Sequence, residues 1–398
     1  MQYRTPTAQF TTLIVNNLRF WQETAVRPEA RPRLQSEQQN VYQAIDMGLQ
    51  VAATMPTATD LLLDLSLFIE QHGSWRVWIP LLEKSVAAHE DVPKRWQLQT
   101  LLAFFYHANG EGKTAVSILR PLLNKPLDIA QRGRVHYHLG NSYSKLRQYD
   151  DARIHVDKAL AIFEAHPEAS RGGSAPALNL LGRINLRTGK QAAAIPLFMQ
   201  ARQRWEQDGY YTYALLALYN EAQAHSEYGQ PEEALRCYQQ AISLLETAGT
   251  LLDAASVYLN LGSFYAAQGK WAEAEAAYLR ADRASLHQQG HLELYAKLIT
   301  SLGFVLMEQG RLETAVFHTT EAITIWQQLG DEPMEANALE NLGDAHFRMG
   351  DLAAAQASYQ RGVDLTSNYP DNLFARQLRQ TLEKKVRGLG KSQILPLA

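Results

Sequence analysis

The sequence is poor in cysteine and lacks long apolar runs. Its 398 residues contain one cysteine, Cys237, which excludes an internal disulfide framework; we also expect no cysteine-based zinc site and no oxidising compartment. No apolar run approaches the ~18 residues of a membrane span. The first 30 residues include Arg4, Asn16, Asn17 and Glu23, where a signal peptide would need its apolar segment. The sequence therefore predicts a cytoplasmic protein that contacts no membrane.

An excess of charge of one sign is also missing. The chain carries 38 Lys and Arg against 41 Asp and Glu, which gives a formal net charge of -3. Nucleic-acid binding requires clustered cationic surface, so this balance argues against a nucleic-acid partner. Hydrophobic residues make up 46% of the chain and charged residues 20%, a composition typical of a folded, globular chain.

A repeat of about 40 residues is the main feature that the sequence does contain. A leucine followed by a small residue recurs, and the small residues are Gly140, Gly182, Ala222, Gly262, Gly303 and Gly343. Ala222 is the one that lacks the leucine. The steps between them are 42, 40, 40, 41 and 40 residues, and two weaker copies precede them. A fixed period of this length is typical of a solenoid.

Other positions keep the same phase. A glycine follows seven residues after the small residue, and a second glycine series closes each unit. The first series is Gly73, Gly110, Gly189, Gly229, Gly269, Gly310 and Gly350, and the second is Gly209, Gly249, Gly290 and Gly330. An alanine lies twelve residues after the small residue, often followed four residues later by a large side chain such as Phe198, Tyr238, Tyr278 or Tyr359.

These series predict two antiparallel helices per unit, A and B, each ending at a glycine because a positive φ suits a helix end. The small residues would let helices A and B approach closely, while the large residues would fill the gap to the next unit. One pair cannot bury its apolar face alone, so the units are expected to stack.

The pattern resembles the tetratricopeptide repeat family over residues 60–368, in its long, roughly 40-residue subgroup. The resemblance implies an all-α, right-handed superhelical solenoid of about eight antiparallel helix pairs with helical caps. Three positions depart from the pattern: Glu221 replaces the usual leucine, Arg147 replaces a first glycine, and Gly362 replaces an alanine.

The N-terminal part, with Trp75 and Trp78 in the first weak repeat, is similar to the segment that leads into the repeats of signal-transducing ATPases with numerous domains. No nucleotide-binding module accompanies it, so we expect a free-standing sensor-like solenoid or a piece of a larger protein. The predicted domains are a lead-in (1–59), two degenerate repeats (60–135), six full repeats (136–368), and a capping helix over 370–387 with a loose tail from Gly388 (369–398). Lys384, Lys385, Arg387 and Lys391 are expected to be solvated.

Catalytic patterns are scarce. Residues 110–114, Gly-Glu-Gly-Lys-Thr, match only the end of a phosphate-binding loop and are better explained as a turn between helices. His136 and His138 would point to different sides of one helix, and Glu221 with His225 is explained as a helix-surface contact. We therefore expect no enzyme activity, no cofactor and no metal site.

The resemblance implies that A-helix side chains line a concave groove, and that the side chains which the repeat pattern leaves free contact a ligand. In this sequence those residues are Arg134, Tyr137, Asn141, Lys145, Asn179, Arg183, Arg187, Tyr219, Asn220, Gln223 and Asn260. In peptide-binding relatives, an asparagine two residues before the small residue holds the ligand backbone, and an amide can both donate and accept. The arginines suit an acidic segment or a free carboxylate terminus.

The predicted function is a non-catalytic scaffold that binds another protein or a peptide segment in this groove. The alternative is a sensor or regulatory subunit of a signalling system, whose solenoid changes shape when it binds a ligand or partner. The stretch 167–177, rich in glycine, proline and serine, is a candidate hinge, and its glycine-rich residues 171–174 motivate the alternative.

Overall fold

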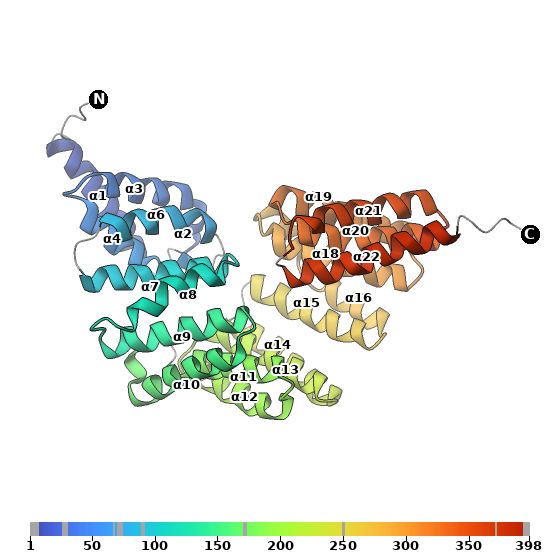
Figure 1. Ribbon diagram of the computed structural model, residues 1–398, viewed down its shortest axis with the longest axis horizontal. Coiled ribbons are helices and arrows are strands. Elements are labelled where there is room, and N and C mark those ends of the chain that lie inside the picture. Colours follow the sequence, from blue (N-terminus) through green and yellow to red (C-terminus); the bar gives the residue numbers. More distant parts are fainter. Residues whose placement is uncertain are drawn as a thin grey trace, which may run out of the picture. The chain divides into compact units, whose positions relative to one another are not determined.

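A computed structural model describes residues 8–25, 31–66, 68–69, 75–88, 92–169, 173–248, 251–370 and 372–392. Within these ranges every regular element is a helix, as expected for an all-α repeat protein. The chain divides into two compact units, residues 1–204 and 205–398, and Figure 1 shows that each consists of helices packed side by side with their chain neighbours.

The first unit begins with helices of the lead-in segment and continues with the repeat pairs. Its helices are α1 (Ala8–Ala25), α2 (Arg31–Ser36), α3 (Gln38–Gln50), α4 (Met55–Asp64), α6 (Trp75–Ala88), α7 (Val92–Ala108), α8 (Gly112–Leu122), α9 (Ile129–Lys145), α10 (Tyr149–Ala165), the 3-10 helix η2 (Pro167–Ala169), α11 (Ala175–Arg187) and α12 (Gln191–Gln207), whose last residues belong to the second unit.

The second unit continues the alternation of A and B helices. Its helices are α13 (Tyr211–Glu227), α14 (Pro231–Ala248), α15 (Leu251–Ala267), α16 (Trp271–Leu279), α17 (Arg283–Gln288), α18 (Leu292–Glu308), α19 (Leu312–Leu329), α20 (Glu332–Met349), α21 (Leu352–Ser367) and α22 (Leu373–Ser392). The A helices are α7, α9, α11, α13, α15, α18 and α20. The number of pairs in the full solenoid, its handedness and the bounds of the four predicted domains stay predictions.

Glycines end the helices as predicted. Positive φ angles are found at both series where they are described, at Gly110, Gly189, Gly229, Gly269, Gly310, Gly350, Gly209, Gly290 and Gly330; Gly73 and Gly249 lie outside the described residues. Gly110 and Glu111 lie in the turn between α7 and α8, and residues 112–114 form the first turn of α8, so this stretch lies where helix A passes into helix B, as predicted. Arg147 adopts the same conformation, with φ 61°, so the fold keeps the left-handed residue where the sequence lacks glycine.

The large residues of the B helices do more than the sequence predicted. Phe198 lies over Gly182 of its own unit, and Tyr278 and Tyr359 lie over Gly262 and Gly343 in the same way. Each ring comes sixteen residues after the small residue that it covers. The expectation that these rings fill only the gap to the next unit was therefore incomplete, because they first close the A and B helices of their own unit.

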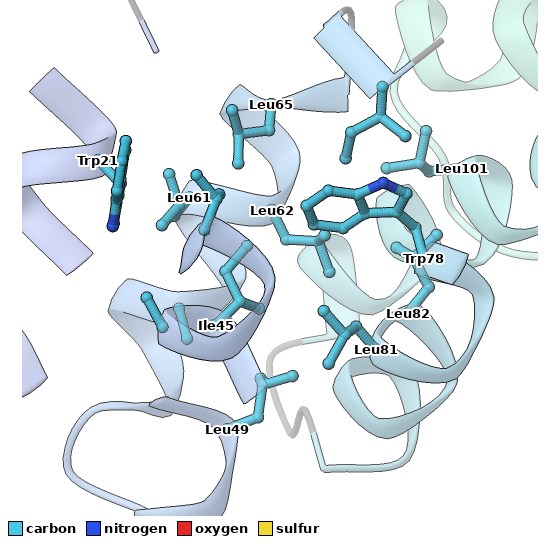
Figure 2. Close-up of a cluster of buried hydrophobic side chains, with 14 of the residues drawn as sticks. Trp21, Ile45, Leu49, Leu61, Leu62, Leu65, Trp78, Leu81, Leu82 and Leu101 are labelled. Atoms are coloured by element: carbon cyan, nitrogen blue, oxygen red, sulfur yellow. The ribbon is translucent and has the colours of Figure 1, made fainter. Parts of the chain in front are cut away.

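One apolar core joins the segment before the repeats to the first weak repeats. Trp78 is completely buried and packs in a cluster with Leu62, Leu81, Leu82 and Leu101, which Figure 2 shows around the indole ring. Trp21 joins the other side of this cluster. The lead-in helices are thus tied to the first pairs by ordinary apolar burial, which contributes ~25 cal/mol per Å².

The last helix differs from the prediction. The loose tail was expected from Gly388, but α22 runs to Ser392 because Leu389 is buried with Leu382 and Val386. Lys385 is not a solvated side chain, since its Nζ lies 2.7 Å from carboxylate oxygens of both Glu340 and Asp344 on α20. Residues 393–398 lie outside the described residues.

One B helix is interrupted. The apolar pattern predicts a continuous helix after Gly269, but α16 ends at Leu279 and α17 begins at Arg283. Asp282 caps α17, and its carboxylate accepts a bond of 3.0 Å from the Ser285 amide, which favours a new helix start. Of the helices within the described ranges, none is both long and apolar enough to cross a membrane.

Candidate partner-binding face

The predicted groove residues of the first unit come from two neighbouring A helices. Arg134, Tyr137, Asn141 and Lys145 recur on α9 at helical spacing, so they share one face of that helix. The helix α9 contacts α7 and α11, and α11 carries the remaining three predicted residues, Asn179, Arg183 and Arg187. The structure therefore brings these residues onto adjacent A helices of the first compact unit.

Lys145 joins two A helices. Its Nζ donates to the carbonyl oxygen of His107 at 2.9 Å and reaches that of Ala108 at 3.5 Å, so the ammonium satisfies the carboxyl end of α7. In the second unit Arg348, at the same repeat position, donates to the Met307 carbonyl at 3.1 Å. Lys145 thus performs a structural role that recurs along the chain, and sequence spacing did not predict it.

Arg183 and Arg187 differ from Lys145. Both are exposed and lie one turn apart on α11. Within the described part of the chain, neither makes an ion pair or a side-chain hydrogen bond. We call Lys145, Arg183 and Arg187 the basic face.

Two histidines beside the basic face remain neutral. Burial lowers the pKa of His107 to about 3, with further contributions from Lys145, His138 and Arg183. Burial, and then Arg134, lowers the pKa of His138 to about 4. Burial, and then Arg183, also lowers the pKa of Lys145. These pKa shifts indicate that Arg183 lies close to both Lys145 and His107, so the positive charges of α9 and α11 gather at the carboxyl end of α7.

The other predicted residues of this unit are more enclosed. Arg134 is half-buried, and its Nη1 donates to the Ala169 carbonyl of η2 at 3.4 Å. Tyr137 packs its ring against that of His138, with centroids 5.2 Å apart. Asn141 is half-buried, whereas Asn179 is only 6% exposed. An amide so buried offers little surface to a ligand, and the ligand-contacting role of Asn179 stays a prediction.

In the second unit, the predicted residues lie on α13 and α15. Tyr219 packs against an apolar cluster, Asn220 is 5% exposed, and Asn260 is half-buried. Gln223 is half-buried and donates from Nε2 to Glu227 of its own helix at 2.9 Å. Two cations toward the end of this compact unit are paired: Arg348 with Glu308, and Lys385 with Glu340 and Asp344.

One further prediction was wrong. Glu221 and His225 were expected to form a helix-surface contact, but Glu221 is buried, with 5% of its surface exposed. The apolar positions of α13 turn the leucine site of the repeat toward the interior, and the glutamate that occupies this site follows them.

These stacked helix pairs, with an A-helix face in each unit, define a helical repeat protein. Sequence models described as tetratricopeptide repeat match residues 131–207, 219–285 and 294–368. The matches cover more than half of the chain, and the chain belongs to the tetratricopeptide repeat family. A comparison with curated proteins finds no match.

Several solved structures share the fold. A signal transduction ATPase with numerous domains from Pyrococcus horikoshii, which has a tetratricopeptide repeat sensor, matches 95% of this chain with 13% identity and a TM-score of 0.60. The match covers 55% of that protein, so this chain spans about half its length. The apo quorum sensor NprR from B. thuringiensis matches 83% of this chain and 97% of its own, with 16% identity and a TM-score of 0.50.

A Rap protein complexed with competence and sporulation factor is similar to a comparable extent. The match covers 84% of this chain and 98% of the Rap protein, at 14% identity and a TM-score of 0.50. Identities this low establish a shared fold, and what each relative binds is a property of that relative.

Proposed function

We propose that the chain is a non-catalytic cytoplasmic scaffold that binds a protein or peptide, and that its basic face holds an acidic segment or a free carboxylate terminus of the partner. One observation carries the proposal: Arg183 and Arg187 are exposed, neighbouring cations that have no carboxylate partner within the described part of the chain.

The chemistry of arginine supports this choice of ligand. A guanidinium group presents paired N–H donors that match a carboxylate, and such charge-assisted bonds are stronger than neutral ones. Arg183 and Arg187 are one turn apart on a helix, so they can hold two successive acidic groups. In the second unit the carboxylates of Glu308, Glu340 and Asp344 already occupy the nearby cations, which favours the first unit as the anion-binding one.

The related structures support the general mode of action. The Rap protein was solved in complex with competence and sporulation factor, and the repeat protein Cut9 in a hetero-tetramer with Hcn1, with a TM-score of 0.50. Proteins that share this fold are thus known in complexes, which supports a binding function for this chain.

The test compares two charge-matched double variants. Arg183→Glu/Arg187→Glu reverses two charges of the basic face, and Lys113→Glu/Arg120→Glu reverses two exposed charges on the B helix α8. The probes are peptides rich in Asp and Glu, their Asn and Gln counterparts, and versions with an amidated C-terminus. Binding is measured by fluorescence anisotropy, and native partners are captured from lysate with the same three proteins.

The proposal expects the wild type and the α8 variant to bind acidic or free-carboxylate peptides, with affinity that falls as salt increases. The basic-face variant is expected to lose at least ~10-fold in affinity. Equal binding by both double variants would place the interaction on another surface, and a preference for neutral peptides would remove the acidic specificity.

The sensor function is a second candidate, favoured by the shared fold with an ATPase that has a tetratricopeptide repeat sensor. Here the partner would alter the conformation around residues 167–177, of which 170–172 lie outside the described residues. Hydrogen exchange of this segment with and without a captured partner tests it. Unchanged exchange at saturating partner would contradict the sensor function and leave the scaffold function in place.

A further inference from the structure

Three metal-ligating side chains meet inside one helix pair of the second compact unit, residues 205–398. Glu221 and His225 lie one turn apart on α13, and Cys237 lies on α14, the B helix of the same pair. One carboxylate oxygen, one imidazole nitrogen and the cysteine sulfur all lie within 4.8 Å of one another. No other group of three such side chains comes this close among the residues that the structure describes.

A comparison of equivalent positions shows that this combination occurs in one repeat. The three positions lie one residue before, three after and fifteen after the small residue, which here is Ala222. In the other units the same positions hold Leu139, Tyr143 and His155; Leu181, Asn185 and Leu197; Leu261, Tyr265 and Ala277; Leu302, Leu306 and His318; and Leu342, His346 and Ser358. The geometry of the repeat brings these positions together in every repeat, but among the six repeats compared only the one with Ala222 has metal ligands at all three.

The donor set suits Zn²⁺. Thiolate, imidazole and carboxylate are its usual protein ligands, and three of them leave a fourth tetrahedral position open. His225 also has the second hydrogen-bond partner that a metal-bound histidine usually has, since its Nδ1 lies 2.8 Å from Oε1 of Gln230. An amide oxygen only accepts, so Nδ1 donates and Nε2 keeps the lone pair that a metal requires.

The surroundings of the cluster are apolar. Glu221 and Cys237 are each 5% exposed, and Cys237 belongs to a core cluster with Leu218, Tyr238 and Phe264. A bound cation stabilises a carboxylate and a thiolate most strongly in such a low-dielectric environment. Glu221 takes the place of a leucine in all five other repeats compared above, so an ionisable side chain has replaced an apolar one at a core position.

We propose that Glu221, His225 and Cys237 bind one Zn²⁺ and so join α13 to α14. Zinc–ligand distances of ~2.0–2.3 Å place tetrahedral ligand atoms about 3.3–3.7 Å apart, so side-chain shifts of about an ångström from the present arrangement complete the site. The Cys237 thiol releases its proton to solvent as the sulfur binds the metal, and water occupies the fourth position. The expectation of no cysteine-based zinc site considered cysteine number alone, whereas here a single cysteine is joined by two other ligand types.

The experiment uses the full chain, reduced and stripped of metal, and titrates it with Co²⁺ and then Zn²⁺. The expected result is one equivalent of Co²⁺, with a sulfur-to-cobalt charge-transfer band and tetrahedral d–d bands that Zn²⁺ abolishes. Cys237→Ser removes the charge-transfer band. Glu221→Leu restores the residue of the other repeats, so it is expected to fold, and it weakens binding at least ~10-fold.

The matched control is His346→Ala, which removes a histidine from the same repeat position in a unit without the other two ligands. It is expected to bind metal as the wild type does, and circular dichroism verifies that every variant is folded. The proposal is overturned if Co²⁺ binds without a sulfur band, if neither metal binds at one equivalent, or if folded Glu221→Leu binds as tightly as the wild type.

Discussion

The ring of Phe198 covers the backbone of Gly182 so closely that no side chain fits between them. A Cβ atom built on Gly182 would lie 2.6 Å from Cε1 and 2.8 Å from Cδ1 of that ring. The glycine of the repeat is therefore required by packing and not by backbone conformation, because its φ is negative, in contrast to the glycines that end the helices. One residue thus determines how closely α11 and α12 pack.

Gly182→Ala is expected to reduce the free energy of unfolding by ~1–3 kcal/mol, since the added methyl group must displace Phe198. The matched control is Gly388→Ala in α22, where a Cβ would meet nothing within 4 Å. There alanine is expected to be neutral or to stabilise by up to ~1 kcal/mol through helix propensity. Urea unfolding of both variants measures the difference; an equal effect would contradict the packing explanation.

Arg147→Gly is expected to stabilise the protein by up to ~1 kcal/mol. Arg147 holds a left-handed conformation that costs an L-residue ~1–2 kcal/mol, and glycine avoids this cost. Part of the gain is lost because glycine loses more conformational entropy on folding than arginine does. Gly189→Arg makes the reverse change at the same repeat position, where φ is 74° and space is open. It should destabilise by a similar amount. Thermal unfolding provides the measurement, and changes of the same sign in both variants would count against the explanation.

His138→Phe is expected to reduce the loss of stability in acid. The pKa of His138 is 6.5 in its ordinary state and about 4 in the fold, so the unfolded chain binds the proton first. The stability contributed by neutral His138 is present above pH 6.5 and is lost as the pH falls toward 4. Between pH 7 and 5 the wild type should lose roughly 1–2 kcal/mol more than the variant. Urea unfolding at both pH values measures the free energy of unfolding of each protein. If the wild type and the variant lose the same free energy of unfolding between pH 7 and pH 5, the prediction is wrong.

Lys385→Met is expected to reduce the free energy of unfolding by ~1–2 kcal/mol. The ammonium of Lys385 lies between Glu340 and Asp344, which are partly buried on α20, and its removal leaves two neighbouring carboxylates uncompensated. Lys384→Met is the control, because Lys384 is exposed and an isolated surface charge contributes little. High salt should narrow the difference between the two variants, and equal urea midpoints would contradict the ion-pair role.

The sequence predicted the repeat features that depend on local conformation. Glycines with positive φ end the helices at the positions that the period indicated, and the alanines twelve residues after each small residue, Ala115, Ala152, Ala194, Ala234, Ala274, Ala315 and Ala355, are buried. The recurrence of one residue type at one repeat position indicates a backbone or packing requirement there, because each repeat has the same geometry.

The candidate site could be predicted only in part. The sequence identified Arg183 and Arg187 as A-helix cations, but it treated Lys145 in the same way, whereas the structure uses Lys145 to cap α7. It also grouped Asn179 and Asn220 with exposed residues although both are buried. Helical spacing tells which residues share a face, but the neighbouring helices decide which of those residues water can reach.

By itself, the sequence determined the helical repeat, its period and the ends of its helices. These features follow from local backbone preferences and from the spacing of apolar residues along the chain, both of which can be read without knowing how the helices pack. Only the tertiary structure decided that α22 continues past Gly388, that Lys385 binds two carboxylates of α20, and that Cys237 meets Glu221 and His225 across a helix pair. Each of these depends on side chains from separate helices reaching the same point, and their distances are set by how the helices pack.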